Sequence, residues 1–243
     1  TLMKKKQLIF GVNAIKEALD SGITFEKVLF HQKVHGDSFR GLIRLLKKKK
    51  VPLKKVPTVA LNRIYNGPHQ GMIAFISPIE YHELEDVVNQ LYDNGKLPFI
   101  LILDQLTDVR NFGAISRSAH AFGVDALVLP VNNSVQISAD AVKTSAGALA
   151  HLKVCRVNSC VEAVSYLKQV GLRVIGLTEK SSQNINDADL GLPLALVLGN
   201  EHSGISDDIM RILDLKLRIP MKESWDSLNV SVAAGIALYS ISK

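Results

Sequence analysis

Short apolar runs alternate with longer amphipathic stretches throughout residues 98–243, and this alternation restricts the folds open to the chain. The runs FILIL, ALVLP, KVCRV, RVIGL and LALVL are rich in leucine, valine and isoleucine, which is typical of strands buried on both faces. Repeated strand–helix units predict a parallel α/β sheet covered by helices on both faces. Ligands of such sheets bind beyond the carboxyl ends of the strands, so polar residues there are the first candidates for a site.

The helices between these strands follow from the 3.6-residue spacing of apolar side chains. They are expected over residues 111–123, 138–151, 159–171 and 207–214, with a last strand over 216–221 and a final helix that begins near Asp226. Asn111 is a candidate cap for the first of these helices, and Asp226 or Ser227 for the last.

The first third of the chain predicts a separate, small α/β domain. Helices are expected over residues 13–22, 37–50 and 58–65, and strands over 27–32, 51–56 and 71–78. Asp37 is expected to open the second helix and Thr58 to cap the third. Residues 79–97 are expected to form a linker with one helix, bounded by Gly95 and Pro98. The predicted domains are therefore residues 1–78 and 98–243.

Charge divides the chain in the same way. Residues 1–80 contain 15 lysines and arginines and 5 acidic residues, whereas residues 81–243 carry a net charge of −4. The densest positive patch is formed by Lys47, Lys48, Lys49 and Lys50, with Lys54 close behind. A solvated helix end is the alternative explanation, since lysines favour the last turn of a helix. In a domain with a net charge of +10, a phosphate backbone is the favoured partner.

Several classes of protein are excluded by composition and motif. The apolar runs are far shorter than a membrane span, and Lys4–Lys6 precede too short an apolar stretch for a signal peptide, so we expect no membrane partner and a cytoplasmic location. Cys155 and Cys160 have neither disulfide nor metal-ligand spacing and are expected to be structural. The sequence contains no G-x-G-x-x-G after its first strand, no phosphate-binding P-loop, no H-E-x-x-H and no G-x-S-x-G.

Polar residues gather after three of the predicted strands. The stretch LTDVRNFGAISRSAH contains Asn111 and Arg117, and GNEHSGI contains Glu201 between two glycines that allow close backbone approach to a ligand. The third stretch, IPM followed by DSLNVSVAAG, opens an apolar helix with Ser227 and Asn229. A helix cap explains one of these polar residues, and the remaining polarity indicates a ligand.

These three segments, in this order and after a basic α/β domain, resemble the SpoU (TrmH-type) family of RNA 2′-O-methyltransferases. NFGAISRSAHAFG is similar to the first family motif, GNEHSGI to the second, and IPM with SLNVSVAAG to the third; KTSAGA, residues 143–148, matches a further family segment. The N-terminal part, from FGVNAIKEAL to HQGMIAF, is similar to the family's L30e-like RNA-binding domain. The layout is closest to that of the 23S rRNA guanosine 2′-O-methyltransferases.

The resemblance implies a SPOUT fold, in which a parallel-sheet domain with a C-terminal trefoil knot follows the L30e-like domain. It also implies that S-adenosylmethionine is the methyl donor and that the protein is a homodimer through its C-terminal domain. By the family's pattern, the catalytic residues are Asn111, Arg117, Glu201, Ser227 and Asn229, and the cofactor lies against Leu198, Gly199, Asn200, Gly204, Ile219, Met221 and Leu228. No metal is required.

A guanidinium keeps its proton at ordinary pH, so Arg117 is expected to orient a phosphate and stabilise a developing oxyanion rather than to act as a base. Glu201 is expected to fix Arg117 through a paired contact. The substrate is expected to be structured RNA, with a guanosine of 23S rRNA favoured over tRNA because such helper domains are more typical of the rRNA-modifying members.

Three alternatives stay open at this point. They are a tRNA 2′-O-methyltransferase, a non-catalytic RNA-binding or ribosome-assembly protein on the same fold, and an α/β enzyme that acts on a small nucleotide. The sequence does not define which nucleotide is modified, nor whether free RNA or a ribosomal particle is bound.

Overall fold

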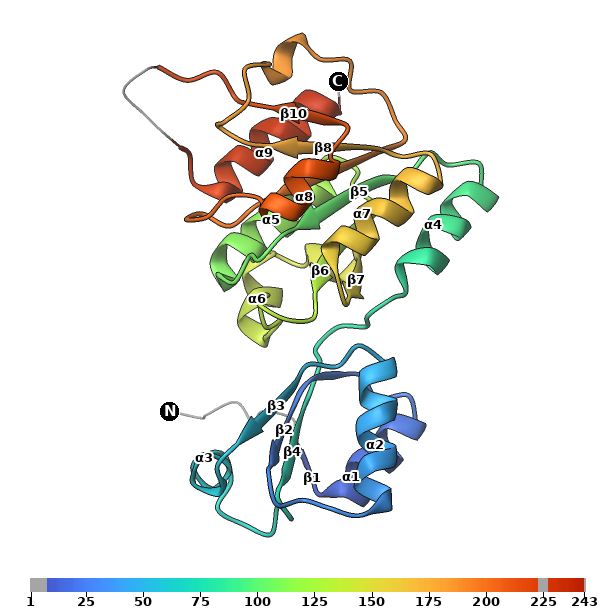
Figure 1. The fold of residues 1–243 in the computed structure, drawn as a ribbon, viewed down its shortest axis with the longest axis vertical. Coiled ribbons are helices and arrows are strands. Elements are labelled where there is room, and N and C mark those ends of the chain that lie inside the picture. Colours follow the sequence, from blue (N-terminus) through green and yellow to red (C-terminus); the bar gives the residue numbers. More distant parts are fainter. Residues whose placement is uncertain (1–7, 223–226, 243) are drawn as a thin grey trace. The chain divides into compact units, whose positions relative to one another are not determined.

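The computed structural model describes residues 8–222 and 227–242, and the chain divides into two compact units, residues 1–80 and 81–243 (Figure 1). Lys4–Lys6 and Asp226, on which two expectations rest, lie outside the described residues.

The N-terminal unit is built on a four-stranded sheet of order β1-β4-β2-β3. Its strands are β1 (Leu8–Phe10), β2 (Phe25–His31), β3 (Leu53–Val56) and β4 (Met72–Ile76), and only β2 and β3 pair in parallel. Helices α1 (Val12–Asp20) and α2 (Asp37–Lys48) cover one face, where Phe25, Leu42 and Leu46 are fully buried. Helix α3 (Thr58–Ile64) packs on the other face through Leu61.

Two details of this unit differ from expectation. The edge strand β1 (Leu8–Phe10) was not predicted from the sequence, because its three residues are too few to show the two-residue alternation of a strand. The N-cap of α3 is Pro57, and Thr58 is its first helical residue.

The C-terminal unit contains the predicted parallel sheet. Its six strands lie in the order β10-β8-β9-β5-β6-β7, and every pair is parallel. The strands are β5 (Phe99–Leu103), β6 (Ala126–Pro130), β7 (Lys153–Val157), β8 (Arg173–Leu177), β9 (Leu194–Leu198) and β10 (Leu215–Leu217). All five side chains of β5 and of β9 are buried, which explains their continuous apolar sequence.

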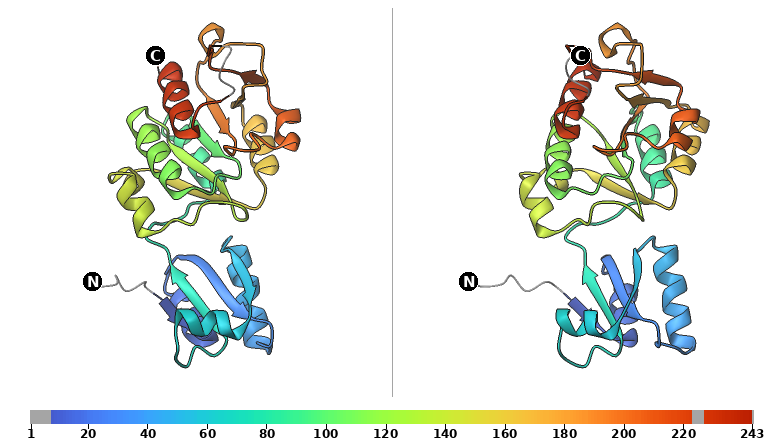
Figure 2. Two further views of the ribbon diagram at one scale, coloured as in Figure 1. Left: turned by 90° about the vertical axis from the view of Figure 1, so that its left-hand side faces the viewer. Right: turned by 60° about the vertical axis from the view of Figure 1, so that its left-hand side comes forward.

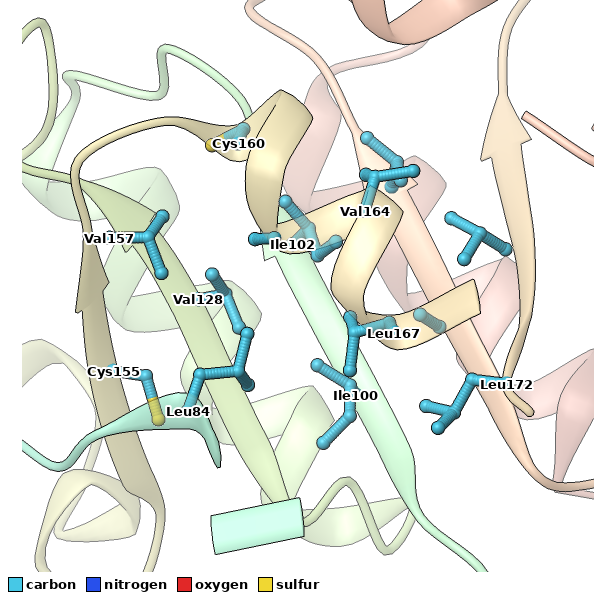
Figure 3. Close-up of a cluster of buried hydrophobic side chains, with 14 of the residues drawn as sticks. Leu84, Ile100, Ile102, Val128, Cys155, Val157, Cys160, Val164, Leu167 and Leu172 are labelled. Atoms are coloured by element: carbon cyan, nitrogen blue, oxygen red, sulfur yellow. The ribbon is translucent and has the colours of Figure 1, made fainter. Parts of the chain in front are cut away.

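Helices cover both faces of this sheet (Figure 2). Helices α4 (Leu84–Asp93), α7 (Cys160–Gln169) and α8 (Asp207–Ile212) pack on one face, whereas α5 (Val109–Ala121), α6 (Ala139–Thr144) and α9 (Val230–Ile241) lie on the other. Figure 3 shows the first of these interfaces, in which Ile100 and Ile102 of the sheet meet Val164 and Leu167 of α7.

Both cysteines belong to this core, as expected from the sequence. Burial, with a smaller contribution from the nearby Asp104 carboxylate, raises the pKa of the Cys160 thiol to about 12. The thiol therefore stays protonated at neutral pH and acts as a small apolar side chain.

The elements around the expected site differ from the sequence prediction at three points. Helix α5 begins at Val109 and is capped by Asp108, whose carboxylate accepts a hydrogen bond from the backbone N–H of Asn111 at 2.7 Å. The single helix expected over 138–151 is broken after α6, because Ala146 and Gly147 have φ values of 50° and 90°. The last strand ends at Leu217, not at residue 221, and the final helix begins at Val230 with Asn229 as its cap.

In residues 8–222 and 227–242, no helix combines the length and the apolar character that a membrane crossing demands.

Candidate active site

A cleft of about 290 Å³ opens beyond the carboxyl ends of β8 and β9. All seven residues expected to contact the cofactor line it: Leu198, Gly199, Asn200, Gly204, Ile219, Met221 and Leu228. Glu201 and Ser227 line it as well. The ends of β8, β9 and β10, which are far apart in the sequence, therefore contribute to one cleft.

The wall after β9 is a tight turn that requires glycine. The backbones of Asn200 and Gly204 bond to each other in both directions, at 3.0 and 2.9 Å, and Gly204 has a φ of 68°. A Cβ on Gly199 would lie 2.1 Å from the carbonyl carbon of Gly204, closer than any two non-bonded carbons can approach. The turn can therefore close only because residue 199 has no side chain.

The loop after β5 holds this turn in place. Asp104 is only 4% exposed, and its carboxylate accepts a hydrogen bond from the backbone N–H of Ser206 at 2.8 Å. The side-chain amide of Asn200 donates to the carbonyl of Gln105 at 3.0 Å, while its oxygen accepts from the N–H of His202. The side chain of Asn200 thus stabilises the loop, and the cofactor contact expected of this residue stays a prediction.

Asn111 joins the three motifs at the edge of the cleft. Its side-chain NH₂ donates to the Glu201 carboxylate, and its side-chain oxygen accepts from the amide of Asn229 at 3.2 Å. The oxygen of Asn229 in turn accepts from the backbone N–H and hydroxyl of Ser231, at 2.9 and 2.6 Å. A side-chain amide offers both a donor and an acceptor on one small planar group, so asparagine suits both bridging positions.

The structure corrects one expected contact. Glu201 bonds to Asn111 rather than to Arg117. Arg117 is exposed on α5, and no residue in the described part of the chain forms a hydrogen bond or ion pair with it. The guanidinium of Arg117 is therefore available to a molecule outside this chain.

Eight lining residues were missed by sequence reasoning. His202, Ser203, Val230 and Ala233 adjoin expected residues, whereas Leu177 ends β8 and Thr178, Glu179 and Lys180 follow it. The signal for the last four was available, because the carboxyl end of every strand in a parallel sheet faces the same edge. The order of strands was not available, and it is this order that places β8 beside β9.

The residues expected to bind RNA belong to the N-terminal unit. Lys47 and Lys48 form the last turn of α2, and Lys49 and Lys50 follow it. Lys54 is exposed on β3. The described part of the chain contains no group of three histidine, cysteine or acidic side chains that could hold a metal ion.

Comparison with known proteins agrees with this architecture. The model of the SpoU rRNA methylase family matches residues 98–239, and a model described as RNA 2′-O ribose methyltransferase substrate binding matches residues 8–82. The protein has the fold of the SPOUT methyltransferases, as predicted. It belongs to the SpoU (TrmH-type) methyltransferase family.

The relatives align over most of their length. A putative TrmH family tRNA/rRNA methyltransferase of Staphylococcus saprophyticus is 34% identical over 96% of this chain and 94% of its own. The SpoU methyltransferase AviRb of Streptomyces viridochromogenes, crystallised with AdoMet, superposes with a TM-score of 0.61 at 24% identity over 97% of this chain and 88% of its own. The TrmH/SpoU tRNA modifying enzyme of A. aeolicus superposes with a TM-score of 0.55 at 30% identity, over 65% of this chain and 82% of its own.

Replacing Gly199 by alanine is expected to destabilise the C-terminal unit by about 1–3 kcal/mol, because the new Cβ forces the turn away from residue 204. Chemical denaturation monitored by circular dichroism measures this change. Gly41→Ala is the matched control, since a Cβ there meets no atom within 4 Å. Equal stability of the two variants would contradict the packing described for Gly199.

Proposed function

We propose that the protein transfers a methyl group from S-adenosylmethionine to a ribose 2′-hydroxyl of RNA, at a guanosine of 23S rRNA. The observation that carries this proposal is the hydrogen-bonded group Glu201–Asn111–Asn229, which joins residues of all three motifs beside the cleft. A protein that kept only the fold would have no need to preserve this group, which disfavours the non-catalytic alternative.

The cleft suits S-adenosylmethionine in the chemistry of its lining. Met221 and Leu228 are each 36% exposed and line the cleft with Leu198 and Ile219, which gives an apolar surface for a flat ring. Glu179, Glu201 and Lys180 supply charged groups for the polar parts of the molecule. When bound, this cofactor supplies a methyl group on a positively charged sulfur, which makes the methyl carbon electrophilic.

The residues of the chain then have to prepare the acceptor. The 2′-oxygen must lie in line with the carbon–sulfur bond that breaks, and its proton passes to solvent as the oxygen–carbon bond forms. Ser227, exposed at the cleft, is proposed to position the ribose. Arg117 is proposed to bind the adjacent phosphate and to stabilise the negative charge that develops on the oxygen.

Arg117→Ala is expected to lower kcat by about 10²–10³-fold, since it removes a charge that acts on the reacting oxygen. The binding of S-adenosylmethionine, measured by calorimetry, should stay unchanged. Transfer of a labelled methyl group to rRNA measures the rate, with Arg211→Ala on α8 as a control for loss of an exposed arginine. Loss of cofactor binding in Arg117→Ala would contradict the role in methyl transfer that is proposed for this residue.

The N-terminal domain is proposed to hold the RNA. The proposed division is a substrate-binding domain at 1–78, a linker at 79–97 and a methyltransferase domain at 98–243. Lys47–Lys50 and Lys54 flank the short turn between α2 and β3, so their charges gather at one end of this domain. Such a cluster attracts the phosphates of structured RNA without reading its sequence.

Replacing Lys47–Lys50 together by alanine is expected to weaken RNA binding and to flatten its salt dependence. The slope of log K against log salt should fall by about 0.7–0.9 for each phosphate that the variant no longer neutralises. Filter binding of 23S rRNA transcripts at several salt concentrations measures the slope, and Lys16→Ala in α1 is the control. A slope equal to that of the wild type would place the RNA elsewhere.

A homodimer through the C-terminal domain is also proposed. Helix α9 exposes Val232 (51%), Ile236 (38%) and Tyr239 (52%) at helical spacing, so they form one apolar stripe. Exposed stripes of this kind are typical of protein interfaces. The stripe runs along the helix whose cap, Asn229, belongs to the hydrogen-bonded group, which would place a second subunit near the site.

Ile236→Glu is expected to convert a dimer to a monomer, because a carboxylate would be buried in the apolar interface. Analytical ultracentrifugation measures the mass, and Val59→Glu on α3 is the control for a charge added at an exposed apolar position. A wild-type protein that is monomeric at all concentrations would refute the dimer.

A tRNA substrate is the second candidate, because two of the relatives above are described as acting on tRNA or as tRNA/rRNA enzymes. Mapping of 2′-O-methyl groups in RNA from cells with and without the protein decides between them. Either substrate fits the proposed cytoplasmic location.

A further inference from the structure

One side of helix α5 presents two arginines to solvent. Arg110 and Arg117 are both exposed and lie seven residues apart, so they project from the same side of the helix about 10 Å apart along its axis. Ala114 and Ala121 lie between and beyond them on the same strip of the helix surface.

The segment KTSAGA, which matches the family but has no role in the site described above, lies beside this strip. A Cβ on Gly113 would lie 2.6 Å from the Cβ of Thr144, so the last turn of α6 is seated against α5 between Arg110 and Arg117. Lys143, the residue before Thr144, is exposed in that turn. The break at Ala146 and Gly147 ends α6 at this point and keeps Lys143 at a helix end.

We infer that Arg110 and Lys143 bind phosphates of the RNA strand that flank the methylated nucleotide. This inference rests on the proposed function and extends it, because it assigns an RNA-backbone surface to the methyltransferase domain. The surface adjoins the site, since Arg110 immediately precedes Asn111, the residue that bonds to Glu201 and Asn229.

The local charges favour an anion. The carboxylates on these two helices are Asp108 and Asp140. Asp108 is already bonded to the backbone N–H of Asn111, which satisfies part of its charge within the helix cap. Lys143 and both arginines have no protein partner among the described residues. The domain has a net charge of −4, yet these three residues present unpaired positive charges on two adjacent helices. Phosphate groups of RNA would compensate these charges.

The test is binding of a fluorescein-labelled oligouridine to the full chain, measured by anisotropy over a range of KCl concentrations. Arg110→Ala and Lys143→Ala are each expected to weaken binding about five- to tenfold and to lower the salt slope by about 0.7, the value for one phosphate of a single strand. Lys143→Arg should retain the slope. Lys216→Ala, on the edge strand β10, is the charge-matched control.

Three further measurements separate this inference from its alternatives. Calorimetry with S-adenosylmethionine and thermal unfolding should give wild-type values for both variants, which excludes damage to the cleft or fold. With rRNA as substrate, KM should rise while kcat at saturating RNA changes little. Salt slopes equal to that of Lys216→Ala would overturn the inference, whereas a wild-type protein that binds RNA but transfers no methyl group would overturn only the proposed function.

Discussion

Parallel pairing of β5 with β9 is the constraint on which the site depends. Five successive residues of each strand pair in register, from Phe99 with Leu194 to Leu103 with Leu198. The two strands are 95 residues apart along the chain, yet this pairing makes their following loops neighbours. Asp104 can then bond to the N–H of Ser206, and Gln105 to the side chain of Asn200. Both strands are fully buried, so the hydrophobic effect that stabilises the sheet also fixes the position of the loops.

The polar residues at this edge act as one network. Asn111 is held through its backbone by the helix cap at Asp108 and through its side chain by Glu201 and Asn229. The amide of Asn111 gives Glu201 a neutral partner, so this carboxylate does not neutralise the exposed guanidinium of Arg117. A preorganised group of this kind costs little to reorganise during a reaction, which is how enzymes stabilise developing charge.

The two domains divide the work of substrate binding in the function proposed above. The N-terminal domain carries a dense lysine cluster, whereas the methyltransferase domain is net negative and places unpaired cations along α5 and α6. Long-range attraction to RNA would thus come mainly from the first domain. The second domain would need only enough positive charge to set the position of one nucleotide.

The sequence by itself determined the parallel sheet, because continuous apolar runs between amphipathic helices leave few other arrangements. It also identified the three motifs of the site: the second and third line the cleft, and the first bonds to both through Asn111. Only the tertiary structure decided which residues bond to one another. It paired Glu201 with Asn111 instead of Arg117, made Asp108 the cap of α5, and placed Glu179 and Lys180 in a wall of the cleft. The physical reason is that apolar burial depends on local periodicity, which the chain displays in one dimension. Polar contacts depend on strand order and on donor–acceptor distances of about 3 Å, which are reached only after strands far apart in the sequence have paired.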